Sequence, residues 1–392
     1  MKKKVLFLTT QFNHGGVERS LIEVCKALDE NKYSITVFLR NNKTELVPLL
    51  PDYVDVIVNH DGHYFRKPKA VLYKLLSKWY SVVNNTKKQA LYDRRLDNYI
   101  YSQKIQNPQK KYFSNHHFDV VVSYTVHLCT EMALLIDADR HYVFFHSEEA
   151  DFHKDITTRS FPKYDKIVAV GPGVEILLRE NFPEFNDKII QLCNYIDAPK
   201  IYDLAKDVPE EITATKKSHS IMFATSARMV SEKGYELAVG AAKILRDNGV
   251  DFEWYFLGDG SERKNVEKLI KDYNLQDRIH LKGFVNNPYP YMAECDIYVH
   301  PAYLEAQPLA IMEAIVLGKA IVSTDSLGGK AVLNYGEKGL LVSQNADAIA
   351  EGIMRFINDP ELKCSFENRY TLEDNMREKR EYAEQWDALL SE

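Results

Sequence analysis

The chain has 392 residues, of which 45% are hydrophobic and 27% charged, and its formal net charge is -6. This length exceeds that of one ordinary domain, so we expect two hydrophobic cores of roughly 150 to 200 residues each. The longest apolar runs fall far short of the roughly 20 residues that a membrane span needs, so no span is expected. The five cysteines show no close-pair spacing. They support neither a disulfide framework nor a zinc knuckle and favour a reducing cytoplasm.

Short apolar runs alternate with amphipathic segments along the chain, which predicts parallel strands joined by crossover helices. In the first half we expect strands near 5–9, 34–39, 54–58, 119–124, 141–145 and 166–170. In the second half we expect them near 221–225, 252–257, 279–282, 297–299, 320–323 and 340–342. Each half is therefore predicted to be a doubly wound α/β sheet.

The apolar periodicity breaks between the two halves. Pro199, Pro209 and a run of Lys, Thr and Ser interrupt it over 197–218, which predicts a linker. Twelve of the seventeen glycines lie at or after Gly234, several at expected strand ends, where a backbone turns tightly or approaches a ligand. We therefore expect the principal nucleotide site in the second half.

A pair of glycines follows the first expected strand. Gly15 and Gly16 precede a helix and allow the backbone to approach a phosphate or a sugar closely. A tight turn without a ligand is the alternative. The spacing is not that of the dinucleotide fingerprint, so a nicotinamide cofactor is not expected.

Positive charge is concentrated between Arg66 and Tyr112, a segment that contains twelve Lys or Arg and only two acidic residues. Within this segment, residues 69–83 place an apolar stripe at helical spacing beside basic side chains, a pattern that suits an anionic bilayer surface. The residues expected at this membrane or acceptor surface are Lys74, Lys78, Trp79, Lys87 and Lys88. A core-facing helix with a solvated basic face is the alternative. Nothing here resembles a nucleic-acid module, so no nucleic-acid partner is expected.

Two further polar features lie in the first half. His146 follows the strand at 141–145 at its carboxyl end, a position for a donor-sugar or acceptor contact or for a structural strand cap. Asp137-Ala138-Asp139 spells the Asp-x-Asp of metal-dependent transferases, but it follows an apolar helical run and has no second acidic cluster nearby. We therefore expect no obligate metal.

A cationic segment follows the strand at 221–225. Arg228 lies just after the strand, and Lys233 and Gly234 precede a helix. Backbone amides, the helix dipole and two cations facing one anion can hold a diphosphate. A solvated loop is the alternative.

Two glutamates eight residues apart lie on either side of a helix start marked by Pro308. Glu313 is surrounded by apolar residues, so its carboxylate needs hydrogen-bond donors, which the hydroxyl pair of a ligand would supply. Glu305 follows the strand at 297–299, at the carboxyl edge where open α/β sheets bind ligands. The alternative is one surface glutamate and one salt-bridged helix glutamate.

This passage resembles the Glu-x7-Glu signature of glycosyltransferase family 4, a family of retaining enzymes with the GT-B fold. The chain keeps Glu305, Pro308 and Glu313, but has Ala306 and Gln307 where glycine and an aromatic residue are commoner. The resemblance implies that Glu305 contacts the donor sugar and Glu313 the ribose hydroxyls. The methyl group of Ala306 could change which sugar fits.

Other segments extend the resemblance. Ala227-Arg228 with Lys233-Gly234 is similar to the family's Gly-Arg…Glu-Lys-Gly motif, and Gly283-Phe284 to its base-contacting loop. The catalytic residues that the resemblance implies are Glu305, His146, Arg228 and Lys233. The implied donor-binding residues are Gly15, Gly16, Arg228, Lys233, Gly258, Gly283, Phe284, Glu305, Ala306, Pro308, Leu309 and Glu313.

The resemblance implies a GT-B fold, in which two Rossmann-like doubly wound domains face an interdomain cleft. Residues 1–197 would form the acceptor-side domain, 198–372 the nucleotide-sugar domain, and 373–392 a helix that crosses back to the first domain. The implied reaction is a retaining transfer of a hexosyl group from a nucleotide-diphosphate sugar, a UDP sugar by family frequency, to a lipid-linked or cell-surface polysaccharide acceptor.

We expect no cofactor, and a cytoplasmic location on the inner face of the plasma membrane. Two alternatives stay open. One is a non-catalytic, nucleotide-sugar-binding partner subunit, and the other is a nucleotide-sugar epimerase of GT-B shape.

Overall fold

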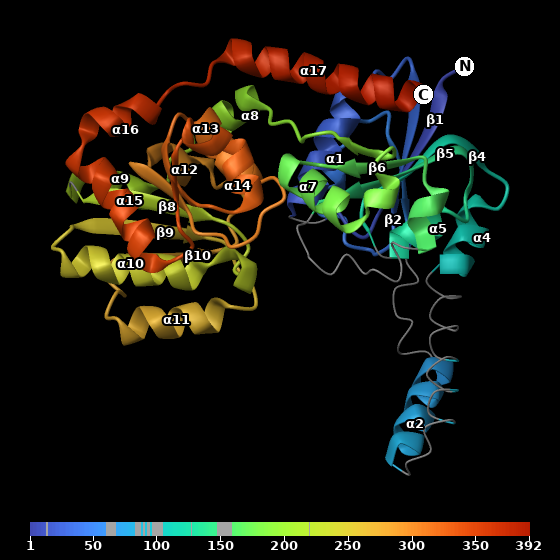
Figure 1. Cartoon of the computed structure of the whole chain (residues 1–392), viewed down its shortest axis with the longest axis horizontal. Helices are drawn as coiled ribbons and strands as arrows, with labels where there is room; N and C mark the ends of the chain where they lie inside the picture. The colour runs from blue at the N-terminus through green and yellow to red at the C-terminus, as the bar shows by residue number, and fades with distance from the viewer. Residues whose placement is uncertain are drawn as a thin grey trace. The chain divides into compact units, whose positions relative to one another are not determined.

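The structure, a computed structural model, divides into two compact units (Figure 1). It describes residues 1–12, 15–59, 68–82, 88, 91, 95, 105–126, 128–146, 159–218 and 220–392. Unit 1 comprises Met1–Ala169, Leu178–Leu192 and Ala383–Glu392, and unit 2 comprises Val170–Leu177 and Cys193–Tyr382.

Unit 1 contains a parallel sheet of seven strands in the order β3-β2-β1-β4-β5-β6-β7. Its strands are β1 (Lys3–Thr9), β2 (Tyr33–Leu39), β3 (Asp55–Val58), β4 (His117–Ser123), β5 (Asp137–Phe145), β6 (Lys166–Ala169) and β7 (Ile189–Gln191). From β1 the chain first adds β2 and β3 on one side, and then adds β4 to β7 on the other side. The strand order therefore reverses between β1 and β4, the place where doubly wound sheets bind ligands at the carboxyl ends of their strands.

Unit 1 also contains several helices. They include α1 (Gly16–Ala27), α2 (Pro68–Val82), α4 (Asn107–Phe113), α5 (Leu128–Ala133), the end of α7 (Pro172–Asn181) and the end of α17 (Leu372–Ser391). The last ten residues of the chain belong to unit 1 because α17 packs on its core. Trp386 is fully buried, and its ring stacks 5.1 Å from that of Phe144 and lies 5.8 Å from that of Phe7.

Unit 2 contains a second parallel sheet, of six strands in the order β10-β9-β8-β11-β12-β13. Its strands are β8 (Ile221–Ser226), β9 (Phe252–Leu257), β10 (Ile279–Gly283), β11 (Ile297–His300), β12 (Ala320–Thr324) and β13 (Leu340–Val342). The order reverses between β8 and β11, so the ligand-binding position of this sheet lies at the carboxyl ends of these two strands.

Helices cover both faces of the unit 2 sheet (Figure 1). The helices of this unit include α8 (Ala198–Leu204), α9 (Glu210–Ser218), α10 (Tyr235–Asp247), α11 (Arg263–Asp272), α12 (Tyr289–Glu294), α13 (Leu309–Val316), α14 (Leu327–Val332), α15 (Ala346–Asn358) and α16 (Pro360–Phe366). Successive residues along a strand point to opposite faces of the sheet and pack into two separate hydrophobic cores. Phe223 and Trp254 pack with α10, α11 and α15, whereas Met222 and Tyr255 pack with α8, α12 and α13. Burial of both faces explains the continuous apolar runs in these strands.

The structure differs from the expected linker over 197–218. This stretch forms α8 and α9, and Ile201 and Ile212 join one core of unit 2. Pro199 lies in the first turn of α8 and Pro209 directly precedes α9, positions where the missing N–H of proline is not needed. The side chain of Asp197 caps α8 by accepting a hydrogen bond from the backbone N–H of Lys200.

The apolar stripe of α2 is exposed. Val71, Leu72, Leu75 and Trp79 are 41%, 51%, 61% and 56% exposed. The core-facing alternative for this helix is therefore wrong for these side chains. No helix in the described part of the chain is both long and apolar enough to span a bilayer.

Candidate functional site

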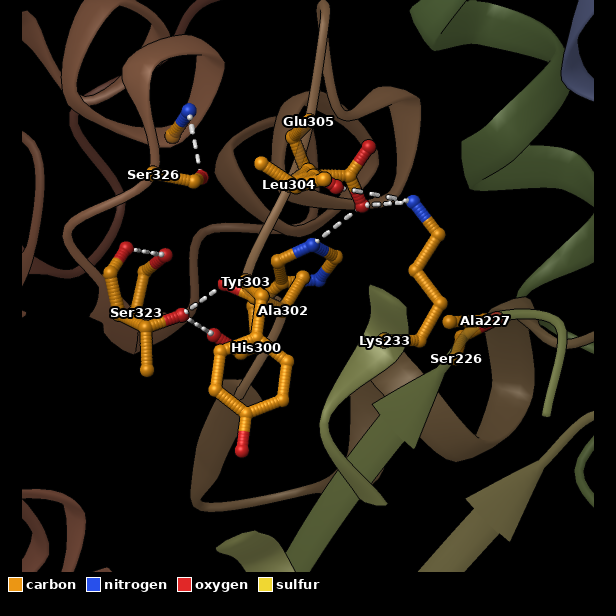
Figure 2. A network of polar contacts seen from close by, with 12 residues as sticks. Ser226, Ala227, Lys233, His300, Ala302, Tyr303, Leu304, Glu305, Ser323 and Ser326 are labelled. Carbon is orange, nitrogen blue, oxygen red and sulfur yellow. Dashed lines mark hydrogen bonds and ion pairs between the residues drawn. The ribbon is translucent and has the colours of Figure 1, made fainter. Parts of the chain in front are cut away.

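The residues with the clearest chemistry in unit 2 lie where β8 and β11 end, at the reversal of strand order (Figure 2). After β8 the chain makes a short 3-10 turn, Ser231–Lys233, before α10. After β11, which ends at His300, it passes through a loop to Glu305. Because parallel strands end at a common edge, two segments far apart in the sequence meet here.

Lys233, Glu305 and His300 form a connected polar group (Figure 2). The Nζ atom of Lys233 lies 2.7 Å from Oε1 of Glu305, and the same oxygen lies 2.8 Å from Nε2 of His300. The side chains are 16%, 12% and 2% exposed, respectively. The Glu305 carboxylate is therefore held between the ammonium of Lys233 and an imidazole N–H of His300.

Glu305 is ionised across the physiological pH range. Burial alone would raise the pKa of its carboxyl group, but the hydrogen bond from His300 and the ammonium of Lys233 lower this pKa to about 2. A carboxylate in this state accepts hydrogen bonds and cannot donate a proton near neutral pH. It is suited to holding sugar hydroxyls in a fixed orientation.

His300 is a site residue that the sequence interpretation missed. Its backbone oxygen accepts a hydrogen bond from Thr324 Oγ1 at 3.2 Å, which ties the end of β11 to β12. Its Nε2 bonds Glu305, whereas its buried Nδ1 has no hydrogen-bond partner among the described residues. The available signal was a histidine ending an apolar strand five residues before the glutamate.

Gly328 supports the Glu305 loop and was also missed. Its backbone N–H donates to the carbonyl oxygen of Glu305 at 2.9 Å. A Cβ atom at this position would overlap the carbonyl oxygens of Glu305 and Ala306. The loop can therefore lie directly against α14 only because residue 328 has no side chain.

Glu313 is buried on α13, at 6% exposure. Its Oε1 accepts a hydrogen bond of 2.9 Å from the hydroxyl of Tyr289, at the start of α12. The sequence predicted that this carboxylate needs donors but did not identify Tyr289 as one of them. The tyrosine offsets part of the cost of burying the charge.

The other expected donor residues lie on loops and helix starts of unit 2. Arg228 is exposed after β8, and within the described residues its guanidinium forms no ion pair or hydrogen bond. Gly258 follows β9, and its N–H donates to the carbonyl of Gly283 at 2.8 Å, which joins two of the expected turns. Phe284, next to Gly283, is 48% exposed.

The start of α13 is fixed by its own loop. Ala306 is buried, Pro308 precedes the helix and Leu309 is its first residue. Gln307 Oε1 accepts a hydrogen bond of 2.7 Å from the backbone N–H of Asn194. Gln307, at a position where the signature that the sequence resembles commonly has an aromatic residue, thus connects the Glu305 loop to the segment entering unit 2.

In unit 1, His146 lies at the carboxyl end of β5. Burial lowers the pKa of its imidazole to about 3, against a hydrogen bond with the backbone of Tyr124. Its buried Nε2 has no partner among the described residues, and its ring lies 4.7 Å from that of Tyr124. The residue is therefore neutral near pH 7 and retains hydrogen-bonding capacity.

Gly15 is the N-cap of α1 and Gly16 is its first residue, a few positions after the end of β1. A Cβ atom at Gly15 would overlap the carboxylate of Glu18, so this glycine leaves room for that side chain. The neighbouring Asn13 and His14 lie outside the described residues. The structure therefore gives Gly15 a packing reason that the sequence interpretation did not contain.

The Asp-x-Asp sequence lies at the opposite edge of the sheet from His146. Asp137 and Asp139 begin β5 and lie 3.0 and 3.4 Å from the two ring nitrogens of His117. Within the described residues, no group of three or more His, Cys, Asp or Glu side chains is placed to hold a metal.

Comparisons with known proteins agree with this arrangement. Residues 208–373, within unit 2, match the family described as Glycosyl transferases group 1. HepE of Anabaena, solved in complex with UDP-glucose, superposes with a TM-score of 0.70 at 17% identity over 99% of each chain. The protein thus has the two-domain α/β fold known as GT-B.

Two relatives are similar to this chain in sequence. One is the N-acetylgalactosamine-N,N'-diacetylbacillosaminyl-diphospho-undecaprenol 4-alpha-N-acetylgalactosaminyltransferase of Campylobacter jejuni, 27% identical over 219 residues. This match covers 55% of the chain and 57% of that relative. The other is an uncharacterized glycosyltransferase of Haemophilus influenzae, 25% identical over 401 residues and 100% of both chains. Together these similarities support a glycosyltransferase of GT-B fold.

Proposed function

We propose that this protein is a retaining glycosyltransferase of family 4 that transfers a hexosyl group from a UDP sugar to a lipid-linked or cell-surface polysaccharide acceptor. The observation that carries the proposal is the group formed by Lys233, Glu305 and His300 at the ligand-binding edge of unit 2. The match of this unit to Glycosyl transferases group 1 supports the same assignment.

In the proposed reaction, the bond between the anomeric carbon and the diphosphate oxygen breaks, and negative charge develops on the departing diphosphate. Lys233 and Arg228 would stabilise this charge, and fixed cations of this kind contribute several kcal/mol in a site that excludes water. The acceptor oxygen forms its new bond on the face that the diphosphate leaves, and its proton passes to the departing phosphate. The configuration at the anomeric carbon is thereby retained.

The carboxylates take binding roles in this proposal. Glu305 stays ionised because its pKa is about 2, so it accepts hydrogen bonds from the donor sugar. Glu313 holds the ribose hydroxyls. His146, with a pKa of about 3, would contact the donor sugar or the acceptor as a neutral imidazole. The proposed chemistry needs no metal.

The relatives support the substrate classes. The Campylobacter relative is named for an acceptor on diphospho-undecaprenol and for an alpha linkage, which retaining transfer from an alpha-linked nucleotide sugar produces. The similar Anabaena structure contains UDP-glucose. We infer the same classes of donor and acceptor for this chain.

We further propose a cytoplasmic location with peripheral attachment to the inner face of the plasma membrane through α2. Its exposed apolar stripe lies beside exposed Lys74 and Lys78, with Lys88 exposed beyond the helix, and Lys87 lies outside the described residues. Each such cation contributes up to about 1 kcal/mol near an anionic surface.

Liposome flotation tests the attachment. Glutamate substitutions at Lys74, Lys78, Lys87 and Lys88 should abolish flotation with anionic vesicles. Glutamate substitutions at three exposed lysines of α11 are the matched control and should leave it intact; these are Lys264, Lys268 and Lys271. Equal flotation of both variants would refute attachment through α2.

A donor screen tests the function itself. The chain is incubated with UDP, GDP and ADP sugars, and nucleoside diphosphate release is measured with and without a lipid-linked acceptor. Release that depends on Glu305 and Lys233 supports the transferase. Binding without release would indicate the non-catalytic partner, and a changed sugar in the nucleotide pool would indicate the epimerase.

A further inference from the structure

Three neighbouring strands of unit 1 are each followed by a polar residue at the carboxyl edge of the sheet. Thr10, Arg40 and Thr125 follow β1, β2 and β4, which are adjacent in the sheet. The register pairs Thr9 with Leu39 and Leu8 with Ser123. Continuing this register places Arg40 on one side of Thr10 and Thr125 on the other. They lie where the strand order reverses, the ligand-binding position of a doubly wound sheet.

The two threonine hydroxyls are held in place by each other and by α5. Thr10 Oγ1 lies 3.2 Å from Thr125 Oγ1, and Thr125 Oγ1 donates to Cys129 Sγ at 3.3 Å. Cys129 is fully buried, which raises the pKa of its thiol. The sulfur is therefore uncharged and cannot balance a nearby cation.

Arg40 lacks such a balancing group. It is half-buried, and its Nε atom is buried without a hydrogen bond among the described residues. No carboxylate of the described chain forms an ion pair with its guanidinium, although its backbone oxygen accepts from Asn59 Nδ2 at 3.3 Å. The guanidinium also lies next to the buried Cys129 thiol, which contacts both threonine hydroxyls but carries no charge to balance it. A partly buried cation without a carboxylate partner is costly, and an anion bound beside it would offset that cost.

We propose that Arg40, together with the hydroxyls of Thr10 and Thr125, forms a subsite in unit 1 that binds a phosphate or carboxylate group of the acceptor. The inference rests on the proposed function, which assigns the donor diphosphate to Arg228 and Lys233 in unit 2. A guanidinium fork beside two hydroxyls matches the planar or tetrahedral oxygens of such a group. The acceptor class is then an anionic glycan or a sugar phosphate.

Equilibrium binding of simple probes tests the subsite. The full chain is saturated with UDP, which occupies the proposed diphosphate site, and is titrated with three sugars. These are N-acetylglucosamine 1-phosphate, glucuronic acid and, as the neutral probe, methyl N-acetylglucosaminide. We expect at least one anionic probe to bind at least about tenfold more tightly than the neutral one, as charge-assisted hydrogen bonds predict. The two anionic probes distinguish a phosphate from a carboxylate ligand.

Variants connect this preference to the residues. Arg40→Gln should abolish the preference, Arg40→Lys should retain part of it, and Thr125→Val should weaken it several-fold. Arg140→Gln, at a half-exposed arginine of the same unit, is the matched control and should change nothing. Each variant is first checked for the UDP affinity and melting temperature of the parent.

The outcomes separate the two proposals. An equal preference in Arg40→Gln, or no preference for either anion in the parent chain, including no binding at all, overturns the subsite. If the parent chain binds no nucleoside diphosphate, the proposed function fails by a separate measurement. If UDP binds and the charge preference is absent, the Arg40 inference alone fails.

Discussion

The ionised carboxylate of Glu305 should make the stability of unit 2 depend on pH, and Glu305→Gln should remove this dependence. The pKa of this group is about 2 in the folded chain, against an ordinary value of 4.5. A difference of this size contributes about 3 kcal/mol to the free energy of unfolding at pH 7. Because the folded-state pKa is the lower one, the contribution is full above about pH 5 and falls to about half at pH 3.

Urea unfolding followed by tryptophan fluorescence measures this contribution. Trp254 is fully buried in unit 2, so Trp79→Phe and Trp386→Phe leave a single reporter of that unit. Unfolding is measured between pH 7 and pH 3 in this background and with Glu305→Gln added. Glu351→Gln, at an exposed position of α15 in the same unit, is the matched control.

The expected result is a stability difference between parent and Glu305→Gln of about 3 kcal/mol at pH 7 that narrows by about half at pH 3. Glu351→Gln should follow the parent at every pH. If Glu305→Gln loses stability in parallel with the parent as the pH falls, the carboxylate is not held ionised by its partners, and the account of the site is wrong.

Other predictions concern the donor site. Lys233→Gln should lower the rate of nucleoside diphosphate release by about a hundredfold or more, because it removes a fixed cation from the leaving group, whereas Lys243→Gln, on the exposed face of α10, should not. Tyr289→Phe should weaken UDP binding several-fold in calorimetry, because Glu313 loses a hydrogen-bond donor; unchanged affinity would contradict this role. Gly328→Ala should lower both the melting temperature of unit 2 and the rate of sugar transfer, since its Cβ overlaps two loop carbonyls.

The central strands of unit 2, namely β8, β9, β11 and β12, were well predicted because they are buried on both faces. The expected strand at 252–257 coincides with β9, Phe252–Leu257. Such strands appear as continuous apolar runs, which can be recognised without knowledge of their neighbours. The chemistry-bearing loops were located for the same reason, since each begins where an apolar run ends.

Boundaries set by polar residues were less predictable. β5 begins at Asp137, four residues before the expected start, because His117 pairs with Asp137 across the β4–β5 ladder and contacts its side chain. The prolines at 199 and 209 suggested a linker but lie at the N-terminal ends of α8 and α9. In both places, tertiary partners decided a conformation for which the local sequence was ambiguous.

The alternation of apolar runs with amphipathic segments was enough to establish two doubly wound sheets, because local periodicity records which faces are buried. It could not establish which loop side chains meet. Lys233 pairs with Glu305, and Arg40 lies level with Thr10 and Thr125, because parallel register brings the carboxyl ends of separate strands to one edge. That register depends on the packing of the crossover helices over the whole sheet, so it exists only in the folded unit.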